Sequence, residues 1–381
     1  MLLEALDEAL AARTAAGLQR RRRVVESACG PRVRVDGRDL IAFGSNDYLG
    51  LTNHPRIVAA MQEALATWGV GAGAAHLLTG HYRVHECLEM ELAEWVGLPR
   101  ALCFSTGYMA NIGVIPALVG REDAVFLDRL DHACLYDGAA LSRAAVERYS
   151  HGDVADLERR LAASKARRKL IATDAVFSMD GDLAPLPELL ALAERFDAWL
   201  LVDDAHGFGV LGEGRGSLAH FGLQSPRIIY MGTLGKAAGV FGAFVAAAAS
   251  VVETLLQNAR SYVFTTASPP ALAQALRASL AVLREEPARR LDLQARIAQL
   301  RTGLAGSGWK LLPSSTAIQP LLIGDNADAL RLSDALWEAG FWVPAIRPPT
   351  VPPGTARLRI SLSAAHRAED VAALIACLRE R

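Results

Sequence analysis

Short apolar runs alternate with amphipathic runs of helical length between about residues 45 and 280, and this alternation most constrains the fold. Short buried strands separated by helices are typical of a mostly parallel sheet that helices cover on both faces. Such sheets bind ligands beyond the carboxyl ends of their strands. We therefore predict an α/β fold whose functional residues follow strands. The predicted strands are residues 101–104, 124–127, 169–173, 199–202, 228–231 and 243–247.

The two ends of the chain have different patterns. Regularly spaced leucines predict a helix over residues 2–26, and a hairpin over residues 33–43 is predicted with a turn at Asp36-Gly37. After about residue 286 the pattern predicts a smaller α+β unit. Its predicted helices are 289–305, 327–339 and one from residue 367, and its strands are 311–312, 318–323 and 357–362. The expected domains are residues 1–45, 46–285 and 286–381.

The composition argues against nucleic-acid binding, a signal peptide, a membrane helix and disulfide bonds. The chain has 381 residues with Lys+Arg 40 and Asp+Glu 41, so it lacks the basic field that a nucleic-acid binder normally shows. Its first residues include acidic side chains and do not resemble a signal peptide. Residues 237–252 are uncharged and mostly apolar, but a membrane helix needs roughly 18–20 residues, so we predict a buried strand that leads into a helix. Five widely spaced cysteines indicate reduced thiols in a cytoplasmic protein.

Lys236 and Asp203 carry the strongest chemical signal in the chain. Lys236 follows a small, hydroxyl-bearing segment that includes Thr233, and Asp203 ends the apolar run 199–202. A carboxylate at such a buried position is costly unless it is paired. A lysine that can form a Schiff base, a loop that can hold a phosphate and a carboxylate that can keep a pyridine nitrogen protonated suit pyridoxal phosphate chemistry. The alternative for Asp203 is a structural salt bridge or a helix cap.

Two motifs suggest ligands but have simpler interpretations. The glycine-rich segment 69–73 fits neither the dinucleotide pattern nor a Walker A loop, and a tight turn is the favoured interpretation. His81, His85 and Glu86 suggest a metal site. However, Glu89 stands where the second histidine of the zincin motif must be, so we favour surface helix positions and predict no metal.

Three further segments have two interpretations each. Residues 105–111 lie between a predicted strand and a predicted helix, where backbone N–H groups bind phosphate or where Ser105 or Thr106 simply caps the helix. An isolated histidine such as His132 is more often structural, unless a flat cofactor ring lies near enough to stack on it. The arginines at 20–23 form a solvated helix end, unless one of them binds a substrate carboxylate.

The order of these motifs resembles the α-oxoamine synthases, which are fold-type I enzymes that use pyridoxal phosphate. The resemblance extends from residues 45–50 (SNDYLG) to residues 361–366 (SLSAAH). It implies a large domain with a mostly parallel mixed sheet covered by helices, a smaller α+β C-terminal domain, and a homodimer with active sites at the interface. Within the family, residues 346–352 (IRPPTVP) are similar to members that join L-alanine to a pimeloyl thioester in biotin synthesis. Glycine C-acetyltransferases and 5-aminolevulinate synthases differ there.

The resemblance also implies a role for each matching residue. The implied catalytic residues are Lys236, His132, Asp203 and His206. The implied cofactor-binding residues are Gly107, Tyr108, His132, Ser178, Asp203, His206, Thr233 and Lys236. The implied substrate-binding residues are Arg20, Asn46, His132, Thr350 and Arg359. Thr265 and Thr266 are candidates to reach the active site of the neighbouring subunit. Ala74, Ala75 and Ala175 depart from residues that are common in relatives, but none belongs to these sets.

The expected reaction is a decarboxylative condensation. Lys236 removes the α-proton of bound L-alanine, the resulting carbanion attacks a pimeloyl thioester, and the carrier thiol and carbon dioxide leave. An acyl-carrier protein is the expected donor, with coenzyme A left open. The rival hypotheses are a synthase for another amino acid and thioester, an aminotransferase on the same fold, and a cofactor-binding regulator without turnover.

Overall fold

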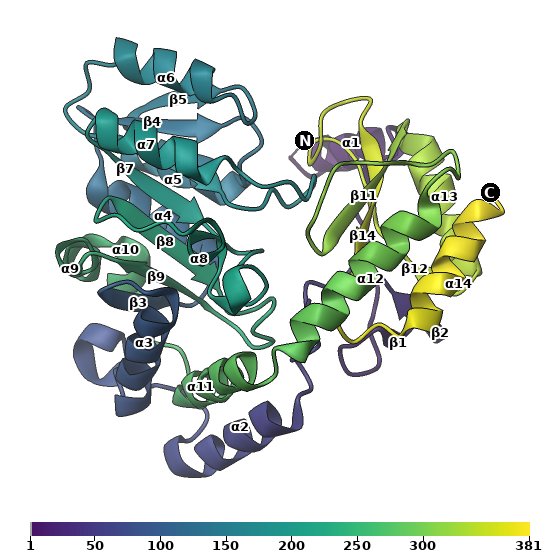
Figure 1. Cartoon of the computed structure of the whole chain (residues 1–381), viewed down its shortest axis with the longest axis horizontal. Helices are drawn as coiled ribbons and strands as arrows, with labels where there is room; N and C mark the ends of the chain where they lie inside the picture. The colour runs from purple at the N-terminus through teal and green to yellow at the C-terminus, as the bar shows by residue number, and fades with distance from the viewer. Residues whose placement is uncertain (1) are drawn as a thin grey trace. The chain divides into compact units, whose positions relative to one another are not determined.

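The computed structural model describes residues 2–381, which fold into two compact units (Figure 1). The larger unit contains residues 49–178 and 182–290. The smaller unit contains residues 2–48, 179–181 and 291–381. The N-terminal segment therefore shares a unit with the C-terminal part of the chain.

A seven-stranded mixed sheet forms the centre of the larger unit, with strand order β3-β9-β8-β7-β6-β4-β5. The sheet is parallel except for β9, which pairs antiparallel with β3 and β8. The predicted strands are confirmed within one or two residues at each end. The strands are β3 (Arg100–Phe104), β4 (Ala124–Asp128), β5 (Ala145–Tyr149), β6 (Lys169–Asp174), β7 (Ala198–Asp203), β8 (Ile228–Thr233) and β9 (Ala243–Ala247).

Strand β5 is the one strand of this sheet that the sequence analysis does not predict. It lies at the edge of the sheet and is mostly exposed, with only Tyr149 buried. The inner strands β4 and β9 are buried at every position, which gives them the apolar runs that were recognised in the sequence. An edge strand with a charged middle has no such run.

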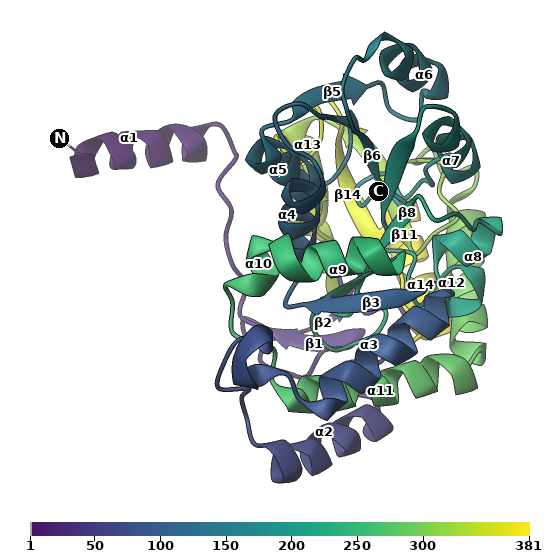
Figure 2. The same ribbon diagram turned by 90° about the vertical axis from the view of Figure 1, so that its left-hand side faces the viewer.

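Helices cover both faces of this sheet, as predicted. Figure 2 shows α4 and α5 on one face and α7 and α8 on the other. The segment 237–252 is confirmed as the buried strand β9 leading into a helix. The helices are α2 (Pro55–Trp68), α3 (Arg83–Val96), α4 (Gly107–Leu118), α5 (Ala133–Ser142), α6 (Val154–Ala163), α7 (Leu186–Arg195), α8 (Ser217–Phe221), α9 (Ala249–Asn258), α10 (Arg260–Val263) and α11 (Pro270–Glu285).

The smaller unit combines two small sheets with four helices. The hairpin of β1 (Arg32–Val35) and β2 (Arg38–Ala42) is confirmed, and its turn places Asp36 and Gly37 at positive φ, as a two-residue hairpin turn requires. Strand β12 (Phe341–Trp342) pairs with β2. The second sheet contains β10 (Lys310–Leu311), β11 (Ile318–Gly324), β14 (Ala356–Ser361) and β13 (Ala345–Ile346). The helices are α1 (Leu2–Ala15), α12 (Ala288–Leu304), α13 (Asn326–Glu338) and α14 (Ala368–Arg379).

The predicted N-terminal helix over residues 2–26 is wrong in its length, because α1 ends at Ala15. Gly17 follows in the left-handed region, with φ of 66°, and the chain then continues without helical structure to Val25, which bridges to Val35 in β1. The leucine spacing predicts a helix face that packs against a core, but no residue of α1 is buried, so no packing contact prolongs the helix beyond Ala15. The arginines at 20–23 therefore lie outside any helix and do not form a helix end.

The parallel strands bring their last residues to one edge of the sheet. Asp174 at the end of β6 pairs in register with Asp203 at the end of β7, and Asp203 pairs in register with Met231 in β8. Polar side chains that are far apart in the sequence are therefore neighbours at this edge. Among the residues that the structure describes, no helix is both long and apolar enough to cross a membrane.

Candidate active site

A cavity of about 210 Å³ lies at this carboxyl edge of the large sheet. All eight residues predicted to bind the cofactor line it, together with four that were not predicted. The predicted residues are Gly107, Tyr108, His132, Ser178, Asp203, His206, Thr233 and Lys236. The others are Cys134, Asp174, Ala205 and Met231. Residues from five separate stretches of chain thus meet around one space.

Lys236 lies in the loop between β8 and β9, half-buried, with its Nζ 2.8 Å from Nε2 of His206. The loop is held closed because Leu234 N–H donates to Gly242 O at 2.8 Å. Gly239 in the same loop has a φ of 71°, and a Cβ there would lie 2.6 Å from the carbonyl carbon of Leu51. The backbone therefore fixes the position from which the lysine amine enters the cavity.

Asp203 is buried at the end of β7, and two neutral donors satisfy its carboxylate. Oδ1 accepts from the N–H of Ala205 at 3.0 Å, and Oδ2 accepts from Nδ2 of Asn111 at 2.7 Å. Burial raises the pKa of Asp203, whereas the positive charge of Lys236 and these two hydrogen bonds lower it. Both groups that hold the carboxylate in place are neutral, so they position it without cancelling its negative charge.

Asn111 links Asp203 to Cys134, and both of these residues line the cavity. Its Nδ2 donates both to Asp203 and, at 3.0 Å, to Sγ of Cys134. Cys134 in turn contacts Nδ1 of His132 with Sγ at 2.9 Å, and its backbone N–H donates to the same nitrogen at 3.3 Å. Because Nδ1 accepts the backbone N–H, the ring proton of neutral His132 resides on Nε2.

The backbone of His132 is anchored by a second buried carboxylate. Oδ2 of Asp174 accepts from the N–H of His132 at 2.9 Å, and the N–H of Asp174 donates to Asp131 at 3.0 Å. Burial, followed by the negative charge of Asp203, raises the pKa of Asp174. The two strand ends therefore place one carboxyl group beside another, and a nearby positive charge stabilises both.

The start of α4 supplies backbone donors to the cavity. Thr106 caps this helix by accepting from the N–H of Met109 at 3.1 Å, which confirms the predicted cap. Gly107 and Tyr108 precede Ala110, whose N–H makes the first backbone hydrogen bond of the helix, so their N–H groups remain for an anion. Thr233 lines the same cavity, and its hydroxyl donates to Gly242 O at 3.2 Å.

The predicted substrate-binding residues other than His132 belong to the smaller unit. Arg359 in β14 is buried, and its guanidinium donates to Oδ1 of Asn46 at 3.3 and 3.4 Å and to Ser361 at 2.8 Å. The structure thus brings Arg359 and Asn46 together. Arg20 and Thr350 are both exposed. Among the described residues, no hydrogen bond joins either of them to Arg359 or Asn46.

Asn111 and Cys134 form the hydrogen-bond link from Asp203 to His132, and neither has a role predicted from the sequence. Asn111 has a recognisable signal, because it is a polar residue in the otherwise apolar helix α4 and is completely buried. Its spacing of four residues from Gly107 also directs it to the same side of the helix. Cys134 has no comparable signal, since a buried cysteine is common in any core. In the glycine-rich segment 69–73, Gly69 and Gly73 have positive φ, and Gly69 ends helix α2.

Residues 38–378 match the model of the family described as "Aminotransferase class I and II". The chain belongs to this family. It is 62% identical to an 8-amino-7-oxononanoate synthase of Aromatoleum aromaticum over 99% of this chain and 98% of that protein. It is 60% identical to the 8-amino-7-oxononanoate synthase of Dechloromonas aromatica over the full length of both.

Solved structures of related proteins are also similar to this chain in shape. The serine palmitoyltransferase of Sphingomonas wittichii has a TM-score of 0.94 and 35% identity, covering 100% of this chain and 98% of that one. An 8-amino-7-oxononanoate synthase of Francisella tularensis has a TM-score of 0.79 and 29% identity, covering 90% and 97%. A high-resolution structure of SPT with a PLP internal aldimine has a TM-score of 0.94 and 33% identity. The larger unit therefore has the fold-type I architecture expected for a pyridoxal phosphate enzyme.

The donor set around the cavity fits pyridoxal phosphate, the cofactor of this aminotransferase-family chain. The cavity offers a primary amine at Lys236, a buried carboxylate at Asp203 and helix N–H groups at Gly107 and Tyr108. These groups complement an aldehyde, a ring nitrogen that binds a proton, and a phosphate, respectively.

We expect Asn111→Ala to weaken cofactor binding by about 10–100-fold, because it removes a donor to the buried Asp203 carboxylate, and a hydrogen bond to a charged group contributes about 1.5–3 kcal/mol. The measurement is a titration of the apoprotein with pyridoxal phosphate, followed by absorbance. The exposed amide Gln257 provides the matched control, since Gln257→Ala removes an amide that does not line the cavity. Unchanged affinity in Asn111→Ala would show that the amide does not support Asp203.

Proposed function

We propose that this chain is an 8-amino-7-oxononanoate synthase, which condenses L-alanine with a pimeloyl thioester and releases carbon dioxide and the carrier thiol in biotin biosynthesis. The relatives of that name, at about 60% identity over the full length, support this assignment. The observation that carries it is that Lys236 and Asp203 line a single cavity, as one cofactor held between an amine and a carboxylate requires.

We assign the cofactor-binding roles to the residues that line this cavity. Lys236 would hold the aldehyde carbon and Asp203 the ring nitrogen, while His132 would cover one face of the ring. Gly107, Tyr108 and Thr233 would bind the phosphate. Ser178 and His206 would contact the hydroxyl side of the ring. The assignments of Ser178 and His206 rest on the family resemblance and on the presence of both side chains in the cavity wall.

When bound, pyridoxal phosphate supplies an aldehyde that takes up the amino group of the substrate and a ring that withdraws electrons from its α-carbon. Asp203 holds a proton at the ring nitrogen, which sustains that withdrawal. Nζ of Lys236 takes the proton from the α-carbon, and His206 orients the amine from 2.8 Å. His132, with its proton on Nε2, donates toward the oxygen that develops negative charge on the acyl group.

Arg359 is the group that we assign to the carboxylate of L-alanine. Its guanidinium is buried, it presents fixed N–H donors that match a carboxylate, and Asn46 and Ser361 set its orientation. Arg20 and Thr350 are proposed to contact the acyl substrate. Both are exposed, so a long, flexible acyl chain is the kind of substrate that they can reach.

The acyl donor, the assembly and the location of the protein complete the proposal. We propose an acyl-carrier protein as the donor, with coenzyme A as the alternative. The protein is proposed to act as a cytoplasmic homodimer with its active sites at the subunit interface, and fractionation of cells checks the location. Thr266 is exposed and Thr265 half-buried in the segment after α10, and neither lines the cavity of its own chain.

The purified protein with L-alanine and a pimeloyl thioester should form 8-amino-7-oxononanoate and one carbon dioxide per turnover, detected by mass spectrometry with both donors. Lys236→Ala should lower the rate by at least roughly 10²–10⁴-fold, because it removes the general base. Borohydride should attach the cofactor to Lys236 in the unsubstituted protein. Conversion of L-alanine to pyruvate without release of carbon dioxide would instead identify an aminotransferase and refute the proposed reaction.

Arg359→Ala should raise the KM for L-alanine by about 10–100-fold, since charge-assisted hydrogen bonds to the carboxylate are lost. Cofactor absorbance should be unchanged, and Arg359→Lys should recover part of the affinity. The exposed Arg381 is the control position, and Arg381→Ala should leave KM unaltered. Loss of cofactor and alanine binding to the same extent would indicate a structural arginine.

Complementation between subunits tests the interface. If Thr265 and Thr266 serve the partner's site, a mixed dimer of one Lys236→Ala chain and one chain with both threonines changed to alanine should keep one intact site. Its activity should be about half that of the unsubstituted dimer. All three substitutions in one chain, paired with an unsubstituted chain, should leave no intact site. A monomer in sedimentation, or equal activity of the two mixed dimers, would contradict the proposal.

A further inference from the structure

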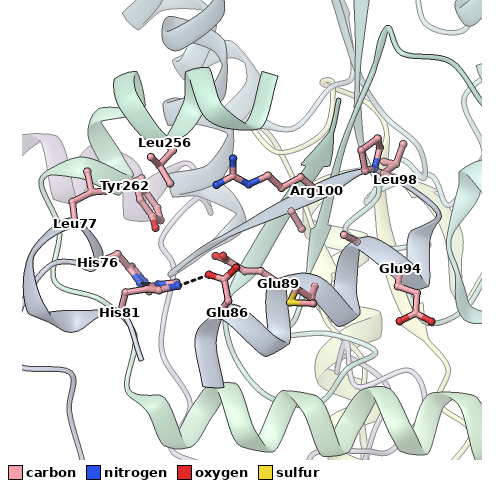
Figure 3. A pocket seen from close by; sticks show the side chains of 14 residues that line it. His76, Leu77, His81, Glu86, Glu89, Glu94, Leu98, Arg100, Leu256 and Tyr262 are labelled. Atoms are coloured by element: carbon pink, nitrogen blue, oxygen red, sulfur yellow. Dashed lines mark hydrogen bonds and ion pairs between the residues drawn. The ribbon is translucent and has the colours of Figure 1, made fainter. Parts of the chain in front are cut away.

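A second cavity in the larger unit shares no lining residue with the candidate active site. It measures about 540 Å³ and is lined by α3, by the turn at His76–Gly80 and by the start of β3. The side chains of His76, His81, Glu86 and Glu89 gather at one end of it (Figure 3). None of these four residues has a role in the proposed reaction. The predicted surface helix positions are wrong in part, because His81 lies before α3 and His85 is buried.

His81 presents its two ring nitrogens to two different partners. Nε2 lies 3.1 Å from Oε2 of Glu86, and Nδ1 lies 2.9 Å from Nδ1 of His76. When Nδ1 of His81 carries the ring proton and donates it to His76, the lone pair of Nε2 points toward the Glu86 carboxylate. Without a cation, Nε2–H of His81 donates to the Glu86 carboxylate. A bound cation takes the place of this proton, so that Nε2 and the carboxylate oxygen become its ligands.

Glu89 lies one helical turn after Glu86 and adds a second carboxylate. It is only 9% exposed, and Oε1 accepts from the N–H of Cys103 at 2.7 Å. Arg100 contributes positive charge to the cavity, but its ion pair is with Glu253, at 2.7 Å. Burial and the charge of Glu86 raise the pKa of Glu89 to about 8. A carboxylate buried beside another one is stabilised by a divalent cation.

The ligand atoms of His81, Glu86 and Glu89 all lie within 4.8 Å of one another. Ligands on a tetrahedral zinc ion, with bonds of about 2.0–2.2 Å, are separated by roughly 3.3–3.6 Å, so side-chain shifts of about 1 Å would close the site. His76 and His85 also lie close to His81. Both ring nitrogens of His85 are already used, since Nδ1 accepts from the N–H of Tyr82 and Nε2 contacts Ser268 O.

We propose that His81 Nε2, Glu86 and Glu89 bind one divalent transition-metal ion, with Zn²⁺ the expected ion, and that His76 is a positioning residue that fixes the tautomer of His81. One imidazole nitrogen with two carboxylates suits zinc, whereas Mg²⁺ and Ca²⁺ prefer oxygen ligands only. Three protein ligands leave a coordination position that faces the cavity. The ion would link the segment before α3 to the helix itself.

Equilibrium dialysis of the holoenzyme against Zn²⁺, with metal analysis, tests the site. The unsubstituted protein should bind one more ion per chain than His81→Ala or Glu89→Gln. His76→Ala should bind Zn²⁺ about 10–100-fold more weakly, because it removes the group that orients a ligand. Excess Mg²⁺ should not displace the ion.

Two controls match the chemistry of these substitutions. Glu94→Gln removes a carboxylate from an exposed position on α3, and His220→Ala removes an exposed histidine outside the cavity. Both should keep the ion. Zn²⁺ should also raise the unfolding temperature of the unsubstituted protein but not that of His81→Ala, which is informative even if Glu89→Gln fails to fold. Equal zinc content in unsubstituted protein and His81→Ala, or displacement by Mg²⁺, would overturn the proposal.

Discussion

The burial of carboxyl groups at the ends of the parallel strands is the constraint on which the candidate site depends. Asp174 and Asp203 end adjacent strands in register, and both are almost completely inaccessible to solvent. Two carboxylates cannot be removed from water side by side without donors and a positive charge. Asn111 and the backbone N–H of Ala205 provide donors to Asp203, and the Lys236 amine provides the charge.

Helix α4 and the loop between β8 and β9 bring these donors and this charge to the edge of the sheet. Helix α4 packs against α5 and brings Asn111 to Asp203, while its first turn keeps N–H groups at Gly107 and Tyr108. The loop between β8 and β9 is closed by backbone hydrogen bonds and directs Lys236 into the same cavity. A parallel sheet can gather these groups because its strands end at a common edge, whereas an antiparallel sheet alternates its strand ends between two edges.

The second cavity also contains a buried carboxyl group beside another acidic side chain, and it therefore also requires donors or positive charge nearby. Glu89 is buried with one hydrogen bond from backbone N–H, and Glu86 lies beside it. At the active site an amine offsets the buried charge. Around Glu89, burial lowers the pKa of His76 to about 3 and that of His85 to about 4, and Arg100 forms its ion pair with Glu253. A divalent cation would provide the missing positive charge.

The strand and helix order of the larger unit, apart from β5, follows from the amino-acid pattern, because buried inner strands require apolar runs and covering helices require amphipathic ones. Eight of the twelve residues around the cavity were also predictable, since a strand end followed by Asp203 or by the loop of Lys236 is a local pattern. The exposed edge strand β5 and the early end of α1 at Ala15 left no such pattern. Which distant side chains meet depends on how the elements pack. The hydrogen bonds from Asn111 to Asp203 and Cys134, and the approach of His81 to Glu86 and Glu89, are set by packing between elements, which no local spacing specifies.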